Sequence, residues 1–324
     1  MKYLMNMVNH ESKLNWFNND WKKLEKFLKE YNLDGVELIF YNDYNIEDIP
    51  KDLIEGMHLI YWPTWLDFWK GNKDKLLKQF INEENIISYY GDLKKQVMIN
   101  KYKKEFEVAQ ALNSNYMVFH VSHVDIEHLF TWDFTYSDKE IFDITIELVN
   151  EVFGNEDKGV TLLFENLWWP GLNFNDMALT KNFFEQINYP NKGFMLDIGH
   201  LMITNKNINT MDEACDYIEE KLNNNILLEY IKGIHLNKSL TGKYLRQNHN
   251  EKIDKINSCT NFWDAIGCAR EHVVNIDTHV PFDHKRMKDI IKLVNPEFVV
   301  YEFLPKNLDE LKEMVCIQND VLER

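Results

Sequence analysis

Residues 160–166 read Val-Thr-Leu-Leu-Phe-Glu-Asn, a short and mostly apolar run that ends on a carboxylate. A run of this kind, continuous rather than alternating with polar residues, is typical of a parallel strand that is buried on both faces. Seven further runs share this pattern and are found at residues 3–8, 35–40, 56–62, 116–121, 193–196, 231–236 and 298–303. The sequence therefore predicts eight parallel strands, with residues 160–164 as the fifth.

The stretches between these runs carry helical patterns. In residues 19–31, Trp21, Leu24 and Leu28 fall on one helical face. Three later stretches begin with a capping pair, which are Ser137 with Glu140, Thr210 with Glu213 and Asn307 with Glu310. Further helices are expected over residues 101–112, 176–187 and 284–294. Strands that alternate with helices predict one α/β domain, a (β/α)8 TIM barrel over residues 1–324. The competing fold is a doubly wound sheet, which often carries a Gly-rich phosphate-binding turn, and the sequence has no such turn.

Two connections are unusually long: residues 63–101 follow the third strand and residues 239–276 follow the seventh. In a barrel both lie over the C-terminal mouth, where binding and catalytic residues gather. The second connection carries four cations, Lys243, Arg246, Lys252 and Lys255. Such a run is typical of a solvated loop. A second hypothesis is that this segment covers an anionic substrate.

Composition and charge exclude several classes of protein. The chain has 324 residues, and its 36 Lys and Arg against 52 Asp and Glu give a formal net charge of −16. Such a surface repels nucleic acids and anionic membranes at long range. No apolar run approaches the roughly 18 residues that span a bilayer, and residues 1–13 lack the apolar core of a signal peptide. Four scattered cysteines without a CxxC pair favour reduced, mostly buried thiols, so we expect a cytoplasmic protein without a membrane partner.

Ligand-type side chains recur where the predicted strands end. They are His58 within the third strand, His120, Glu165, Asp197, His235 and Glu302 at the ends of the fourth to eighth, and His200, Asp277 and His279 in the connections. Strand ends of a barrel meet at one mouth, so these side chains should converge. Imidazole and carboxylate bind zinc, manganese and related ions, and converging acids without arginine repel one another unless a cation is bound. The set predicts a divalent-metal centre.

Taken singly, two of these residues also fit structural roles. His58 is equally typical of a core histidine, and Asp197 of a helix N-cap. The remaining histidines of the central and C-terminal regions have no such placement and are expected at the surface or in loops: His123, His128, His249, His272 and His284.

The motifs at 196–200 (LDIGH), 232–239 (KGIHLNKS) and 277–279 (DTH) resemble those of the xylose-isomerase-like TIM-barrel superfamily. This superfamily includes sugar isomerases and epimerases and the endonuclease IV-type nucleases of AP endonuclease family 2. The nuclease resemblance implies three zinc ions on nine residues, which by motif are His58, His120, Glu165, Asp197, His200, His235, Asp277, His279 and Glu302. The epimerase resemblance implies one divalent ion, such as manganese or magnesium, on Glu165, Asp197, His235 and Glu302.

The chain departs from both groups. The segment between His235 and Asp277 is longer than in the nucleases, and the Gly-rich stretch after their Asp-x-His pair is replaced by Val-Pro-Phe-Asp-His at 280–284. The sequence has four arginines: Arg246, Arg270, Arg286 and Arg324. Because phosphate clamps and minor-groove contacts rely on arginine, DNA is disfavoured as a substrate. The epimerase arginine that follows the metal histidine is also missing from residues 235–241.

Three functions follow from these residues. The first is metal-dependent phosphoester hydrolysis with up to three zinc ions, on a small phosphodiester or an abasic nucleic acid, in which Glu165 and Glu302 are catalytic and orient the attacking hydroxide. The alternative is a sugar or sugar-phosphate isomerase or epimerase in which the same two glutamates exchange a proton with substrate. A third is a non-catalytic ligand-binding barrel. The complete nine-residue set favours the hydrolase.

Aromatic residues crowd the expected mouth. They are Tyr61, Trp62, Trp65 and Trp69 after the third strand, Trp132 and Phe134 after the fourth, and Trp168 and Trp169 after Glu165. They suit stacking on a sugar or another flat ligand. They equally suit packing of the barrel rim or the subunit contact of a homo-oligomer.

Overall fold

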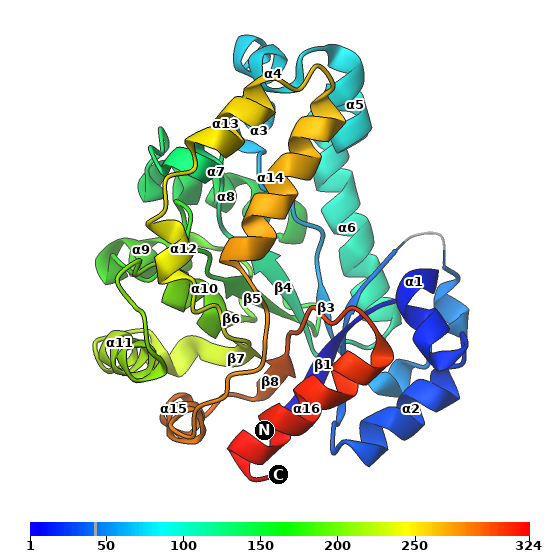
Figure 1. The fold of residues 1–324 in the computed structure, drawn as a ribbon. Coiled ribbons are helices and arrows are strands. Elements are labelled where there is room, and N and C mark those ends of the chain that lie inside the picture. Colours follow the sequence, from blue (N-terminus) through cyan, green and yellow to red (C-terminus); the bar gives the residue numbers. More distant parts are fainter. Residues whose placement is uncertain (42–43) are drawn as a thin grey trace.

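The computed structural model describes residues 1–41 and 44–324. Its strands form a closed parallel barrel in which each strand pairs with its sequence neighbours and β8 pairs with β1, which confirms the predicted TIM barrel (Figure 1). The strands are β1 (Lys2–Val8), β2 (Gly35–Ile39), β3 (Ile54–His58), β4 (Tyr116–His120), β5 (Thr161–Glu165), β6 (Lys192–Asp197), β7 (Ile231–Leu236) and β8 (Phe298–Tyr301). His58 therefore ends its strand rather than lying within it, and Glu302 directly follows β8.

Helices surround the barrel and fill the long connections. They are α1 (Glu11–Leu14), α2 (Trp21–Glu30), α3 (Leu66–Lys70), α4 (Lys73–Phe80), α5 (Glu83–Tyr90), α6 (Gln96–Ala111), α7 (His128–Thr131), α8 (Asp138–Phe153), α9 (Met177–Gln186), α10 (Ile198–Ile203), α11 (Met211–Asn223), α12 (Gly242–Leu245), α13 (Asn250–Asn257), α14 (Phe262–Ile276), α15 (Met287–Val294) and α16 (Leu308–Leu322). Short 3-10 turns are η1 (Asn15–Phe17), η2 (Ile46–Asp48), η3 (Lys51–Leu53) and η4 (Leu228–Tyr230). None of the described helices is long and apolar enough to cross a membrane.

The predicted helix starts are confirmed at three N-caps. Ser137 and Thr210 each close a reciprocal capping box, the first with Glu140. Asn307 caps α16 by accepting the backbone N–H of Glu310 at 2.9 Å. Each cap satisfies an N–H group that the helix itself leaves unpaired, so the sequence signal has a direct physical cause.

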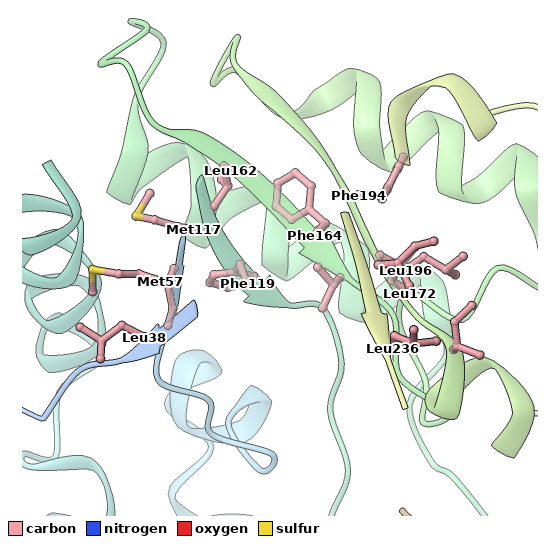
Figure 2. Packing of buried hydrophobic residues seen from close by; sticks show 14 of the residues in the cluster. Leu38, Met57, Met117, Phe119, Leu162, Phe164, Leu172, Phe194, Leu196 and Leu236 are labelled. Carbon is pink, nitrogen blue, oxygen red and sulfur yellow. The ribbon is translucent and has the colours of Figure 1, made fainter. Parts of the chain in front are cut away.

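The strand pleat separates two apolar clusters. Outward-facing residues such as Met57, Met117 and Leu162 belong to the large cluster packed between strands and helices (Figure 2). Their strand neighbours Val118 and Leu163 belong to a small separate cluster. Successive strand residues point to opposite faces, so this small cluster fills the barrel interior. A residue two positions further along a strand shares its face, which directs the strand-end ligands into the interior as well.

The two long connections pack against each other at one end of the molecule, at the top of Figure 1. Phe262 of α14 lies 4.8 Å from Phe80 of α4, measured between ring centroids. Residues 239–276 therefore form helices rather than the expected solvated loop. Arg246 donates to the backbone carbonyl of Lys206, so this cation is engaged in a contact between segments.

Two groups of side chains are placed differently from the sequence expectation. Only Cys215 is buried among the four cysteines, and Cys316 is exposed, so the expectation of mostly buried thiols is wrong. Three histidines expected at the surface or in loops are buried, namely His123, His128 and His272; His123 does lie in a loop, whereas His128 and His272 lie in α7 and α14. His272 stacks on Phe130 at 4.2 Å, because the connections fold into a packed layer that the one-dimensional pattern does not reveal.

Gly56 of β3 gives a direct test of the barrel interior. A Cβ at this position would overlap the ring of Tyr116, which is fully buried. We expect Gly56→Ala to destabilise the protein by about 1–3 kcal/mol, the usual cost of overpacking. Gly267→Ala is the matched control, because its Cβ would meet nothing within 4 Å in α14 and should stabilise by up to about 1 kcal/mol. Equal denaturation midpoints for both variants would contradict this packing.

Candidate metal centre

All nine predicted ligand residues converge at the C-terminal mouth, and the exposed fraction of each side chain is at most 12%. They form three groups in which one ligand atom from each member lies within 4.8 Å of the others. The groups are His58, His120 and Glu165; Glu165, Asp197, His235 and Glu302; and His200, Asp277 and His279. Glu165 belongs to two groups, so these two are adjacent.

The first group is set by three neighbouring strands. His120 and Glu165 are register partners of β4 and β5, and His120 Nε2 lies 3.1 Å from Glu165 Oε2. His58 Nε2 lies 3.2 Å from the same oxygen. The Nδ1–H of His58 donates to the carbonyl of Leu59 at 3.0 Å, which turns Nε2 towards the group. A hydrogen bond from the outer ring nitrogen is how proteins fix the tautomer of a metal-binding histidine.

The second group lies between β5, β6, β7 and the end of β8. Asp197 and His235 are register partners, and His235 Nδ1 lies 3.1 Å from Glu165 Oε1 and 3.4 Å from Glu302 Oε2. Asn237 donates to Asp197 Oδ2 at 2.7 Å and to Glu302 Oε2 at 3.4 Å, so it ties the two carboxylates together.

The third group depends on the segment after α14. Asp277 Oδ2 lies 3.2 Å from His200 Nε2 and 2.7 Å from His279 Nε2. Ser239 donates to Asp277 Oδ1 and accepts the backbone N–H of Thr278, each at 3.0 Å. His279 has a positive φ of 46°, an uncommon conformation that is found at functional sites. Its Nδ1–H donates to the carbonyl of Glu302 at 2.9 Å, which presents Nε2 to the group.

Asp197 is both a helix N-cap and a candidate metal ligand, the two roles that its sequence position suggested. It is the N-cap of α10, where it accepts the backbone N–H of His200 at 2.5 Å, and it is also a member of the second group. Asn166 holds the same corner, because its amide exchanges two hydrogen bonds with the Asp197 backbone at 2.9 and 3.0 Å. The carbonyl of Asn166 also accepts from His200 Nδ1 at 2.8 Å.

Sequence reasoning missed Glu37 of β2. Its Oε2 accepts the hydroxyl of Tyr116 at 2.9 Å and lies 3.1 Å from His235 Nε2, so it orients His235 from behind. Its ligand atom also groups with those of His58 and His235. The sequence does contain one sign of this role, since Glu37 is the single acidic residue in the apolar run 35–40. Asn166, Asn237 and Ser239 lay within quoted motifs, yet residue type alone does not reveal their supporting contacts.

The centre concentrates negative charge. In residues 1–41 and 44–324, no Lys or Arg nitrogen lies within 4.0 Å of the acidic oxygens of the centre, which belong to Glu37, Glu165, Asp197, Asp277 and Glu302. Burial of such a cluster is costly unless positive charge balances it. Buried carboxylates beside imidazoles are the donor set of zinc and similar ions, so the residues fit a divalent-metal centre.

The pKa values of the histidines respond to these acids. Burial opposes the charge on His58, but the hydrogen bond and charge of Glu165 outweigh it and raise the pKa to about 9. Burial likewise opposes the charge on His279, while Asp277 and Glu302 raise the pKa to about 10. His120 differs, because burial dominates and lowers its pKa. Burial and the neighbouring acids Glu302, Glu165 and Asp277 raise the pKa of Asp197 to about 8, against the charge of His200.

A model of the xylose isomerase-like TIM barrel family matches residues 13–297. The chain belongs to this family. Three similar solved structures are endonuclease IV from Thermus thermophilus, a D-tagatose 3-epimerase-like protein, and IolI with a bound zinc atom. The respective identities are 11, 16 and 16%, with TM-scores of 0.55, 0.53 and 0.53. Each match covers 100% of this chain and 99, 97 and 98% of the other, and among curated proteins none matches.

Most aromatic residues at the mouth of this xylose isomerase-like barrel are packing residues. Trp62, Trp65 and Trp69 are buried in the main apolar cluster. Two aromatic rings flank the centre: Tyr61 lies 4.4 Å from His120 and Trp168 lies 5.0 Å from His200, measured between ring centroids. These contacts fix the orientation of the imidazoles.

The raised histidine pKa values predict that metal binding releases protons. Below about pH 9, His58 and His279 carry protons in the metal-free protein, and a metal binds only the neutral ring. We expect zinc titrations at pH 7 to release protons, with the apparent affinity rising until about pH 10. Calorimetry in two buffers of different ionisation enthalpy measures the release.

Two matched variants test whether the released protons come from the metal centre. His279→Gln should reduce the number of protons released, and His10→Gln, at the exposed N-cap of α1, should not. Zinc binding without proton release at pH 7 would contradict the assigned pKa directions.

Proposed function

We propose that the protein is a metal-dependent phosphoester hydrolase that holds up to three divalent ions, preferentially zinc, and acts on a small phosphodiester. The observation that carries the proposal is the arrangement of the nine residues as three groups, two of which share Glu165. A single-metal isomerase requires only the second group. The first group adds two histidines, His58 and His120, that such a reaction does not need. The third group adds two further histidines and an aspartate.

When bound, divalent ions lower the pKa of water to about 7 and offset negative charge on phosphate. Both oxygens of Glu165 face imidazoles, and the side chain is fully buried, so this residue holds the two neighbouring groups in place. Glu302 is more open, with 12% of its side chain exposed, and in our proposal it takes the proton of the attacking water. In the reaction the water oxygen bonds to phosphorus, the ester P–O bond breaks, and the leaving alcohol takes up a proton.

A small substrate is favoured over DNA for two reasons. The net charge of −16 opposes binding of a polyanion, and Arg246 and Arg286 are already engaged in contacts within the protein. An apolar cluster that includes Trp168, Leu245 and Ile276 also links the residues after β5 to the helices after β7. Trp168 of this packed layer lies 5.0 Å from His200, measured between ring centroids.

The second candidate is a sugar or sugar-phosphate isomerase or epimerase. The observation that favours it is the second group itself, because Glu165, Asp197, His235 and Glu302 supply one ion with two glutamates, an aspartate and a histidine. One glutamate would remove a substrate proton and the other would return it. In this case the outer groups bind the hydroxyl or phosphate groups of the substrate.

Hydrolysis of bis(p-nitrophenyl) phosphate by zinc- or manganese-loaded protein tests the proposal. We expect turnover, and a loss of kcat/KM of about 100-fold or more in Glu302→Gln because the proton acceptor is removed. Glu55→Gln is the matched control, since Glu55 lies at the opposite end of β3 and pairs with Lys2.

The competing reaction is measured on the same samples. Exchange of a carbon-bound hydrogen of D-fructose or D-tagatose with deuterated water reports epimerase chemistry. Exchange without phosphodiester turnover would overturn the hydrolase and support the epimerase. Full phosphodiester activity in Glu302→Gln would contradict the assigned role of Glu302.

A further inference from the structure

A cavity of about 470 Å³ lies between α4, α7, α13 and α14, outside the metal centre. Its apolar lining comes from Ile126, Phe130, Ile253, Ile256 and Phe262, and none of the nine candidate ligands contributes to it. Its volume falls within the range of sites for small organic molecules. The walls come from the connections after β3, β4 and β7, so an occupant would contact all three.

The charged side chains around this cavity leave a negative excess. Lys78 Nζ and Glu127 Oε2 lie 3.3 Å apart, so their charges offset each other. Asp133 also lines the cavity, and no basic nitrogen of the described residues lies within 4.0 Å of its carboxylate. The charge of Lys206 acts on Asp133 from beyond this distance, and its ammonium sits over the ring of Trp132 at 3.7 Å rather than on the carboxylate. The cavity therefore favours a cation over an anion.

One wall is held in a strained conformation. Ile81, directly after α4, has φ 74° and ψ −47°, and the N–H of Asn82 donates to the carbonyl of Phe80 at 2.9 Å across it. A β-branched residue rarely adopts this tight turn. The turn leaves the Ile81 side chain 54% exposed on the cavity lining. An apolar side chain kept in this position offers contact area to a bound molecule.

We propose that this cavity is a binding site for a small organic amine, with its apolar body between Phe130 and Phe262 and its ammonium group at Asp133. The ligand needs both a cation and an apolar body, because the walls supply apolar contact and the rim supplies the exposed carboxylate of Asp133. The site is separate from the metal centre, so it does not depend on the proposed hydrolase.

Three matched fluorinated probes test the site by ¹⁹F NMR titration of the full-length protein. They are 2-(4-fluorophenyl)ethylamine, 2-(4-fluorophenyl)ethanol and 3-(4-fluorophenyl)propionate, which share a ring and differ in charge. We expect saturable binding of the amine at least about tenfold tighter than of the propionate, which corresponds to about 1.4 kcal/mol. The alcohol should fall between them.

Variants locate the binding. Ile256→Trp fills the cavity and should abolish amine binding, and the milder Ala265→Met should weaken it if the first variant does not fold. Ile226→Trp, at an exposed isoleucine before η4, is the control. Asp133→Asn should weaken the amine and leave the alcohol unchanged, whereas Asp52→Asn in η3 should affect neither.

Four results would overturn the proposal. They are the absence of saturable binding by any probe, equal affinity for amine and propionate, undiminished amine binding in both cavity variants, and loss of amine binding on treatment with a chelator. The last result would place the amine at the metal centre instead. Binding that persists in the chelated protein and is lost in the cavity variants supports a separate site.

Discussion

The barrel mouth holds five carboxylates against five imidazoles, with each side chain at most 12% exposed, and no Lys or Arg of the described residues lies within 4.0 Å of the acids. Removing this much charge from water is unfavourable unless compensating positive charge and hydrogen bonds are supplied. The surrounding residues supply some of these hydrogen bonds. Asn237 and Ser239 donate to the carboxylates, and backbone carbonyls fix the outer nitrogens of His58, His200 and His279. A divalent cation is the charge that this arrangement accommodates.

The parallel pleat explains why strand ends could be predicted as the site. In β4, Val118 belongs to the inner cluster, Phe119 to the outer one, and His120 returns to the inner face. The apolar run and its terminal polar residue are both visible in the sequence, so the position of His120 follows from counting. Glu37 was not predicted because it lies in the middle of β2, and the prediction considered polar residues at strand ends.

For the two long connections, after β3 and β7, the sequence predicted the length but not the packing of their helices. Their helices pack through long-range contacts such as Phe80 with Phe262, which no local pattern specifies. Burial of His128 and His272 depends on the same packing, so the prediction that they lie at the surface or in loops was wrong. The capping boxes at Ser137 and Thr210 succeeded because both partners lie within four residues.

The TIM-barrel fold is compatible with several reactions, and the similar structures at 11–16% identity share the fold alone. Our proposal chooses between them by the groups of ligand atoms. Glu165, Asp197, His235 and Glu302 would serve either chemistry, and we propose a multinuclear centre because of the two outer groups. The proposed amine cavity is lined by residues of the helical connections and not by residues of the barrel interior.

We propose above all that the mouth holds three ions, one in each group of ligand atoms, and that two of these groups share Glu165. Anomalous diffraction at the zinc edge, on crystals of protein purified without chelator and soaked in zinc, tests this claim most directly. The account predicts three anomalous peaks, one within each group of ligand atoms, with two of them adjacent to Glu165. A single peak among Glu165, Asp197, His235 and Glu302, or no peak at the mouth, would contradict it.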